Sequence, residues 1–388
     1  MGVKKIGIEC ENLEGERFGV GHTMAQLLSE LAKTPGLQKR YKFVLYFKNE
    51  VPKDEFLKHH IFEKKIIRFP GLPTSFNIFY HILLPFYFLK DGLDFFFFPS
   101  YMLPAFFPSK KAMVVLTNDV WWEAHYGSLP FRYRLSYRLF SKWAAIRAKR
   151  IMTISDFSKK ELMKYYKLPE EKIFVNYWGL GDQFKPLEKD NENLDILNEI
   201  KHNLGIKKDY ILSIGQAFER RRVKEAMQAF EKIAEKHPDI QYLVPCTDKN
   251  NPPVLDELAE RINEKLGREA IIRTKYLDRE DLVYLFNFAK LLIYVSEKEA
   301  LGLPPAEALK CGVPALVKDN GLTHEIFENN AFFVKSADNI EEFSKVMEDA
   351  LINKKKIEEI KQNREKVLQK LEWKKHVEKL LELLDQIV

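Results

Sequence analysis

Residues 291–314 read LLIYVSEKEALGLPPAEALKCGVP, and this stretch decides the fold class. It opens with an apolar run, as in a buried strand, and a polar loop then leads into apolar residues spaced for a helix. Strands that alternate with helices in this way form parallel sheets with helices on both faces. The stretch therefore predicts an α/β fold.

The same alternation runs through the whole chain. We expect strands at residues 5–8, 42–47, 65–69, 95–98, 113–116 and 150–154, with helices such as 22–32 and 133–148 between them. A second series begins with a strand at 210–214 and leads to the strand at 291–295. Because 388 residues exceed what one hydrophobic core usually supports, we expect two domains of this class.

The segment 178–208 is the best candidate for a linker, because it holds Gly179, Gly181, Pro186 and a polar run. We therefore expect an N-terminal domain at residues 1–185 and a C-terminal domain at residues 186–368. Residues 369–388 carry apolar side chains at helical spacing, and such a helix needs another surface to cover. The N-terminal domain is a candidate for that surface.

Composition and charge exclude several classes of protein. The chain has 62 Lys and Arg against 56 Asp and Glu, a small excess for so charged a surface, and nucleic-acid binding is not implied. Its 3 cysteines lie far apart and fit neither a disulfide framework nor a zinc site. The first residues lack the apolar core of a signal peptide. We expect a cytoplasmic protein.

One region has the composition of a membrane-facing surface. Residues 124–155 contain Lys and Arg but no acid, and residues 76–98 are rich in Phe and Tyr. Charged residues interrupt the aromatic run well short of the roughly 20 apolar residues that span a bilayer. A basic segment beside aromatic side chains can sit at a membrane interface, although core packing is the commoner explanation. Contact with the inner face of the membrane is therefore an open alternative.

Two acids stand out in the stretch 291–314. Glu299 lies in the loop beyond a predicted strand, where open parallel sheets bind ligands. Gly302 allows the backbone to approach a bound group, and the helix that follows offers free N–H groups to an anion. Glu307 lies about one turn inside that helix. The two carboxylates can therefore accept hydrogen bonds from the hydroxyls of one ligand.

A run of cations follows the strand at 210–214. The sequence GQAFERRR at residues 215–222 places Arg220 and Arg221 at the start of a helix, where cations oppose the helix dipole. Fixed cations in such a place suit a diphosphate leaving group, which gains negative charge as its bond breaks. A solvated charge run is the alternative explanation.

The acids at 299 and 307, set within Gly-Leu-Pro-Pro and Cys-Gly-Val-Pro, resemble the E-x7-E signature of glycosyltransferase family 4. The family implies the GT-B fold, with two Rossmann-like doubly wound parallel-sheet domains facing an interdomain cleft. It also implies metal-free transfer of a sugar with retention of configuration. Glu299 would hold the sugar hydroxyls, Glu307 the ribose, and Arg220 with Arg221 the diphosphate. Arg221 departs from the family, which has lysine in this place, so the contact geometry can differ.

Further donor-side positions follow from the same resemblance. Gly215 matches the glycine before the cations, and Gly302 with Leu303 matches the loop at the helix start. Tyr276 and Leu277 lie where the family makes main-chain contacts to the base. The family uses a nucleoside diphosphate sugar as co-substrate and no cofactor.

In the first domain, Gly19 and Gly21 precede the helix expected at residues 22–32. A dinucleotide-binding fingerprint is excluded, because its third glycine would fall at Met24 and no acid follows the second strand. In family 4 a glycine-rich loop here lies by the donor phosphates or the acceptor, and a plain turn is as good an explanation. Asn118 and Asp119 resemble the family's His-Asp pair, and Asn118 offers only hydrogen bonds where the histidine could carry charge.

The motif form slightly favours mannose from GDP-mannose over glucose from UDP-glucose. The acceptor class that fits the family is a polysaccharide, an O-antigen or a lipid-linked oligosaccharide. Two alternatives stay open: a sugar-nucleotide epimerase of similar fold, and a non-catalytic carbohydrate-binding relative of such an enzyme.

Overall fold

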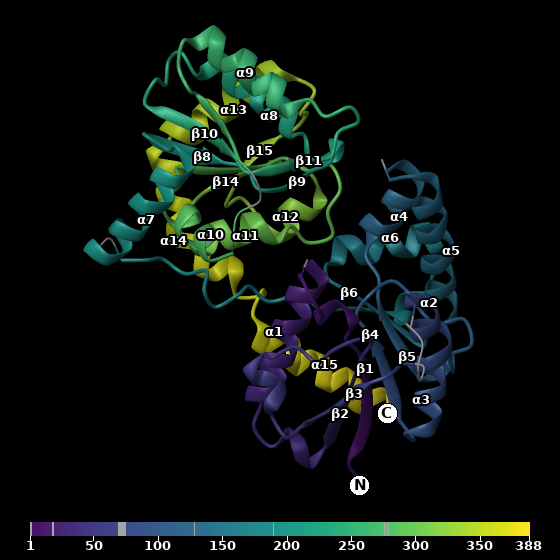
Figure 1. The fold of residues 1–388 in the computed structure, drawn as a ribbon. Coiled ribbons are helices and arrows are strands. Elements are labelled where there is room, and N and C mark those ends of the chain that lie inside the picture. The colour runs from purple at the N-terminus through teal and green to yellow at the C-terminus, as the bar shows by residue number, and fades with distance from the viewer. Residues whose placement is uncertain are drawn as a thin grey trace. The chain divides into compact units, whose positions relative to one another are not determined.

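The computed structural model describes residues 2–17, 19–68, 75–127, 129–188, 190–274, 277 and 279–388. The chain forms two units (Figure 1). The N-terminal unit consists of Met1–Gly179 together with Leu371–Val388, and the C-terminal unit is Leu180–Lys370. The division between them thus follows Gly179, a few residues before the expected boundary at 185. The last residues of the chain belong to the N-terminal unit.

The N-terminal unit is built on a seven-stranded parallel sheet with the strand order β3-β2-β1-β4-β5-β6-β7. Its strands are β1 (Lys4–Glu9), β2 (Tyr41–Phe47), β3 (Phe62–Ile66), β4 (Phe95–Phe98), β5 (Ala112–Val115), β6 (Arg150–Thr153) and β7 (Ile173–Val175). Ile6 of β1 lies opposite Phe43 on one side and Phe95 on the other. The direction of strand addition reverses between β1 and β4, which makes this the topological switch point of the sheet.

Both faces of this sheet are covered. The helical elements are η1 (Glu11–Leu13), α1 (Gly19–Lys33), η2 (Leu37–Lys39), η3 (Glu55–Lys58), α2 (Phe76–Ile78), η4 (Phe79–Leu83), α3 (Leu84–Lys90), η5 (Ser109–Lys111), α4 (Asn118–Tyr126), α5 (Phe131–Arg147), α6 (Asp156–Tyr166), η6 (Glu170–Lys172) and α15 (Trp373–Ile387). Phe95 and Phe97 join the hydrophobic core under α1 and α15, whereas Phe96 and Phe98 join the core under α3 and α5. Side chains alternate along a strand, so an all-Phe strand fills both cores at once.

The C-terminal helix α15 packs against α1. Its residues Val377, Leu380 and Leu384 are buried in the same core as Leu27 of α1. The Asn176 amide donates to the backbone oxygen of His376 at 3.0 Å, which fixes the start of the helix.

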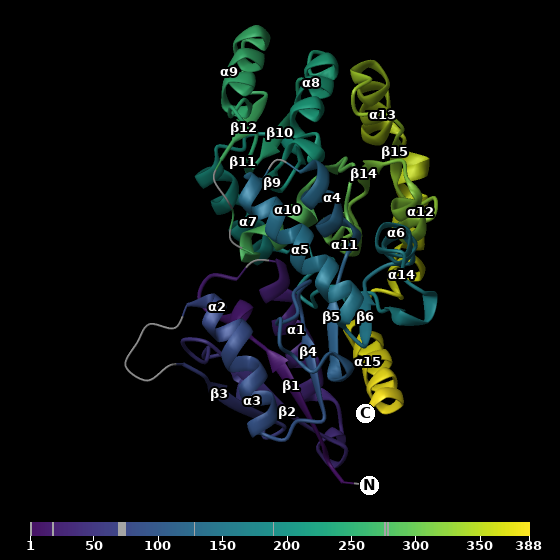
Figure 2. The same cartoon turned by 90° about the vertical axis from the view of Figure 1, so that its right-hand side faces the viewer.

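The C-terminal unit contains a six-stranded parallel sheet in the order β12-β10-β8-β13-β14-β15 and a two-stranded parallel pair, β11-β9. The strands are β8 (Asp209–Leu212), β9 (Gly215–Ala217), β10 (Ile240–Val244), β11 (Cys246–Asp248), β12 (Ile271–Arg273), β13 (Leu291–Tyr294), β14 (Ala315–Lys318) and β15 (Phe332–Val334). The helices are α7 (Asn191–Leu204), η7 (Glu219–Arg221), α8 (Val223–Ile233), α9 (Leu255–Leu266), α10 (Arg279–Phe288), α11 (Leu303–Lys310), α12 (Gly321–Phe327), α13 (Ile340–Ile352) and α14 (Lys354–Leu368). Helix α8 packs between α9 and α13 (Figure 2).

These two parallel sheets confirm the predicted fold class. The predicted bounds of the strand at 65–69 are wrong. The strand runs from Phe62 to Ile66, and Phe69 lies outside the described residues. This strand lies at an edge of the sheet, and Phe62 is its only buried residue, so it lacks the continuous apolar run that marked the central strands. Among the described residues, no helix is long and apolar enough to cross a bilayer.

Candidate functional site

The best candidate site lies in the C-terminal unit, beyond the carboxyl ends of β8 and β13. These neighbouring strands mark the point where the order of that sheet reverses. Open α/β sheets bind ligands in the crevice at such a switch point. The segments 213–222 and 295–302 follow these two strands, so residues about 80 positions apart in the chain are brought together.

The segment after β8 is shaped by a glycine. Gly215 has φ +95°, a left-handed conformation that suits glycine. A Cβ atom there would lie 2.6 Å from Nη1 of Arg221, so the absent side chain leaves room for the guanidinium. Arg221 Nη1 donates to the backbone oxygen of Gln216 at 3.3 Å. Gly215 therefore sets the position of Arg221.

The two loops are joined by Glu299. Its Oε1 accepts from Arg220 Nη1 at 3.0 Å, and Nε of Arg221 lies 3.4 Å from the same oxygen. The hydroxyls of Tyr294 and Ser296 donate to it at 3.0 and 2.9 Å. The structure thus brings together the three residues that the sequence predicted as catalytic. We call Arg220, Arg221 and Glu299 the arginine–glutamate cluster.

The two arginines of the cluster stabilise the charged form of Glu299. Burial raises the pKa of Glu299, but the nearby charges of Arg221 and Arg220 outweigh burial, and the net pKa lies below its ordinary value of 4.5. Glu299 is therefore a carboxylate at neutral pH. With two guanidinium groups around one carboxylate, the cluster keeps a surplus of positive charge.

The third arginine of the run has a different place. Arg222 has φ +52° and directs its guanidinium to Glu225 at 3.0 Å, Asp338 at 3.1 Å and Glu297 at 3.7 Å. The N–H of Glu297 also donates to the backbone oxygen of Arg220 at 2.9 Å. Arg222 therefore connects the loop after β8 with Glu297 in the loop after β13, and with Glu225 of α8 and Asp338. The sequence analysis did not assign this role to Arg222, although Glu225, three residues further along the chain, indicated an ion pair.

The other predicted donor-side residues lie around the start of α11. Gly302 caps this helix with φ +78° and ψ +60°, and Leu303 is its first residue. Glu307 lies on its buried side with 7% of its surface exposed. Of the two positions expected near the base, Leu277 is partly buried, and Tyr276 lies outside the described residues.

In the N-terminal unit, the predicted residues lie at the carboxyl edge of the other sheet. Gly19 opens α1, and a Cβ atom on Gly21 would lie 2.2 Å from the backbone oxygen of Asn12. Packing against η1 is thus sufficient to require glycine at position 21. Asn118 is fully buried at the start of α4, and its backbone N–H donates to Oγ of Ser158 at 3.0 Å. Asp119 follows it in the first turn of the helix.

The sequence analysis missed Glu9. This residue ends β1 at the switch point of the N-terminal sheet and is 1% exposed. Its Oε1 accepts from the N–H of Glu11 at 2.7 Å. Burial raises its pKa to about 8, with Glu11 and Glu14 adding to the effect. An acid at the end of a central strand was the available signal.

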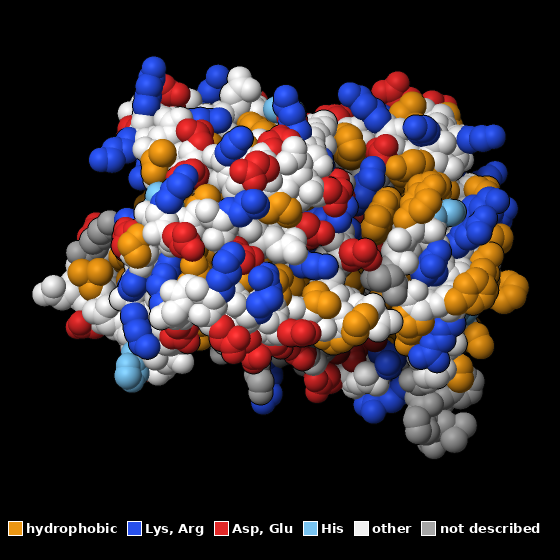
Figure 3. Space-filling view, turned by 90° about the horizontal axis from the view of Figure 1, so that it is seen from above, with side chains coloured by type: hydrophobic (Ala, Val, Ile, Leu, Met, Phe, Trp, Pro, Cys, Tyr) orange, Lys and Arg blue, Asp and Glu red, His pale blue; other side chains and the backbone are white. Residues whose placement is uncertain are grey.

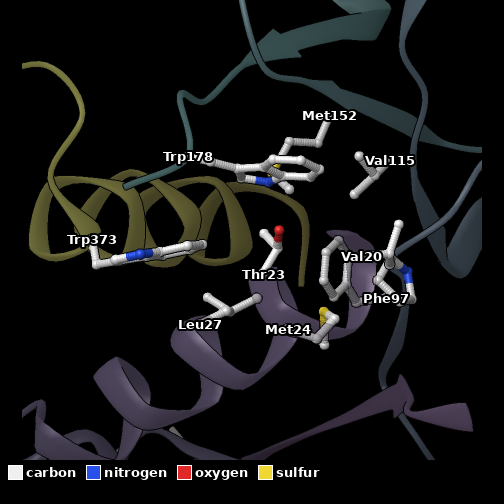
Figure 4. Close-up of a pocket in the computed structure, with 10 residues that line it drawn as sticks. Val20, Thr23, Met24, Leu27, Phe97, Val115, Met152, Trp178 and Trp373 are labelled. Carbon is white, nitrogen blue, oxygen red and sulfur yellow. The ribbon is translucent and has the colours of Figure 1, made fainter. Parts of the chain in front are cut away.

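A small cavity lies between α1 and the start of α15 (Figure 4). It is lined by Val20, Thr23, Met24, Leu27, Phe97, Pro99, Val115, Met152, Trp178 and Trp373 and holds only about 10 Å³. That volume is near the minimum for one water molecule, and most of its lining is apolar. It is a packing gap and not a site for a sugar.

Comparisons with known proteins agree with this fold. In the solved structures, HepE of Anabaena in complex with UDP and glucose superimposes over 99% of this chain and 100% of its own, with a TM-score of 0.70 and 13% identity. Similar matches include WaaG, described as a glycosyltransferase involved in lipopolysaccharide biosynthesis, with a TM-score of 0.67 and 18% identity over 98% of this chain and 99% of its own. The chain therefore has the GT-B fold.

The family match is more specific. Residues 195–367, within the C-terminal unit, match the family model of glycosyl transferases group 1. A curated relative is the serotype-specific mannosyltransferase WbdA of Escherichia coli, 26% identical over 218 residues, which are 55% of this chain and 26% of WbdA. The chain thus spans about a quarter of that relative's length.

Proposed function

We propose that this chain is a hexosyltransferase that moves a sugar from a nucleoside diphosphate sugar to an acceptor hydroxyl with retention of configuration. The arginine–glutamate cluster is the observation that carries the proposal. Two guanidinium groups at the switch point of the sheet suit a diphosphate, and they stabilise it most when its charge grows during bond cleavage. The match of residues 195–367 to glycosyl transferases group 1 and the similarity to WbdA support the same reaction class.

Each donor-side residue has a place in this scheme. Arg220 and Arg221 hold the diphosphate, and Glu299 accepts from the sugar hydroxyls. Glu307 accepts from the ribose hydroxyls. The anomeric carbon loses its bond to the phosphate oxygen while the acceptor oxygen bonds on the same face, and the acceptor proton passes to the departing phosphate. No protein nucleophile is required in this scheme.

The backbone and the N-terminal unit supply the remaining contacts. In this proposal, Gly215, Gly302 and Leu303 bring main-chain groups near the phosphates, and Leu277 contacts the base. Gly19, Gly21, Asn118 and Asp119 are the residues that we propose for the acceptor side. Because Asn118 cannot carry the charge of a histidine, it supplies hydrogen bonds only.

We propose GDP-mannose as the donor, since WbdA is described as a mannosyltransferase, with UDP-linked glucose as the alternative that HepE suggests. A glycan or a lipid-linked oligosaccharide is the proposed acceptor, in polysaccharide biosynthesis at the inner face of the membrane. Arg220 and Arg221 can stabilise the negative charge of the diphosphate in place of a metal ion. Transfer should therefore persist in the presence of EDTA.

A ligand screen followed by a transfer assay tests the proposal. Thermal unfolding with GDP, UDP, ADP and dTDP identifies the base, because a ligand that binds only the folded chain raises its melting temperature. Transfer from the matching nucleotide sugar should be lost in Glu299→Ala and kept in the matched control Glu297→Ala. A folded wild type that binds none of the four nucleotides contradicts the proposal. Conversion of the donor without an acceptor, and without release of nucleoside diphosphate, would identify an epimerase instead.

A further inference from the structure

Helix α5 presents its apolar stripe to solvent instead of to the core. Phe131, Leu135, Leu139, Trp143 and Ile146 recur at helical spacing, and they are 77, 41, 59, 39 and 55% exposed. The buried positions of the helix are the small residues Ser141, Ala144 and Ala145. A surface helix of a globular protein normally has the opposite arrangement.

A second exposed stripe lies next to it. Ile82 of η4 with Phe86 and Leu89 of α3 are 56, 56 and 68% exposed, again at helical spacing. The rings of His81 and Phe140 stack at 5.3 Å, so η4 and α5 are in direct contact. Both helices also cover the same core of the N-terminal sheet. We call the exposed residues of α5, η4 and α3 the α3–α5 face.

The charges on this face have one sign. Helix α5 carries Arg132, Arg134, Arg138, Lys142 and Arg147 and no acid. Two of these cations lie over exposed rings: Arg132 over Tyr133 at 4.8 Å and Arg147 over Trp143 at 5.4 Å. Figure 3 shows hydrophobic and basic side chains interleaved at the right-hand side of the view, where α4 and α5 lie.

We propose that the α3–α5 face docks on an anionic lipid membrane. Exposed aromatic and aliphatic side chains on a basic helix can enter the boundary between headgroups and acyl chains, while the cations meet lipid phosphates. A cytosolic protein partner would need acids of its own to match this face, whereas an anionic bilayer supplies negative charge over its whole surface. The membrane contact deepens the proposed function, since it would hold the chain where a lipid-linked acceptor lies.

Vesicle sedimentation tests the docking without any sugar transfer. The full chain should pellet with vesicles of phosphatidylcholine plus phosphatidylglycerol, and it should pellet less as salt rises. Leu139→Ser should lower the partition coefficient about tenfold, because it removes most of the apolar gain of a buried leucine. Lys142→Gln should lower it about fivefold, the loss expected for one cation at an anionic surface.

The matched controls lie in the C-terminal unit. Ile352 is also 59% exposed, and Ile352→Ser should pellet like the wild type, as should Lys355→Gln. All the replaced side chains are exposed, so the variants should unfold at the wild-type temperature. Lys142→Gln serves as the test if Leu139→Ser does not fold.

The docking is overturned if the wild type stays in the supernatant with anionic vesicles, or if Leu139→Ser and Ile352→Ser pellet equally. It is also overturned if the wild type is an oligomer that does not bind vesicles and Leu139→Ser is a monomer. The α3–α5 face would then be an interface between copies of the chain. Failure of this binding leaves the transferase proposal standing, and loss of transfer leaves the binding result standing.

Discussion

Replacement of Glu299 by glutamine tests the electrostatic reasoning at the site most directly. The carboxylate lies against two guanidinium groups at 3.0 and 3.4 Å, and the side chains of all three residues are less than one fifth exposed. Glutamine keeps the shape of the side chain and removes its charge. The two guanidinium groups then lose their shared anion in a largely desolvated place.

The expected loss of stability is about 3 kcal/mol at pH 7. Removing one partner of a buried ion pair costs about 3–5 kcal/mol, since the remaining charge is left unpaired. The lower end applies because the amide oxygen can still accept from the hydroxyls of Tyr294 and Ser296, and because the cluster is not wholly sealed from water.

The pH dependence has a defined sign. The pKa of Glu299 is lowered on folding, so the unfolded chain takes up the proton first as the pH falls. The stabilisation is therefore complete above the ordinary pKa of 4.5 and declines as the pH falls through the folded value. The difference between wild type and Glu299→Gln should shrink in the same range.

Urea unfolding at pH 7 and below pH 4.5 measures this difference, and calorimetry measures binding of the nucleoside diphosphate. The matched control is Glu297→Gln in the same loop. Its nearest cations lie at 3.7 and 3.8 Å and its side chain is 29% exposed, so it should lose at most about 1 kcal/mol. Glu299→Gln should bind the diphosphate more tightly than the wild type, because the carboxylate that competes with the diphosphate for Arg220 and Arg221 is gone. Equal stability of the two variants at pH 7, or a folded Glu299→Gln that no longer binds the diphosphate, would refute the reasoning.

Three further predictions follow from the backbone and from buried titratable groups. Gly302→Ala and Gly267→Ala should each cost about 1–2 kcal/mol in urea unfolding, because both positions have φ above +60° and neither meets a steric clash, but only Gly302→Ala should also slow sugar transfer. Equal transfer rates in the two variants would show that the start of α11 does not position the donor. His376 is buried and donates from Nδ1 to the backbone oxygen of Tyr177 at 2.9 Å, and burial lowers its pKa to about 4. Because its folded pKa is depressed, the chain should lose up to about 3 kcal/mol as the pH falls from 6.5 to 4, and His376→Asn should flatten this loss in pH-dependent unfolding. Glu9 has a pKa raised to about 8, so stability should instead fall as the pH rises from 4.5 to 8, and Glu9→Gln should remove that slope; a wild type whose stability shows the same slope as Glu9→Gln would contradict this.

Features that are local in the chain could be predicted from the sequence. The strand β4 is four consecutive phenylalanines, and such a run is apolar on both faces whatever surrounds it. The order of strand, loop and helix around Glu299 was also predictable, because Gly302 and the two prolines signal the start of α11 within a few residues. The edge strand β3 was misplaced, because its half-exposed residues carry a weaker apolar signal.

The amino-acid sequence by itself determined the α/β class and the residues that carry charge at the candidate site. Only the tertiary structure decided that Arg220 and Arg221 share one oxygen of Glu299 while Arg222 ties down the scaffold, since these contacts depend on β8 and β13 being neighbours. It also decided that α15 closes the N-terminal core, about 200 residues from Asn176. The physical reason is the same in both cases: side-chain periodicity is local, whereas the order of strands and the partner of an apolar face are settled by packing between distant segments.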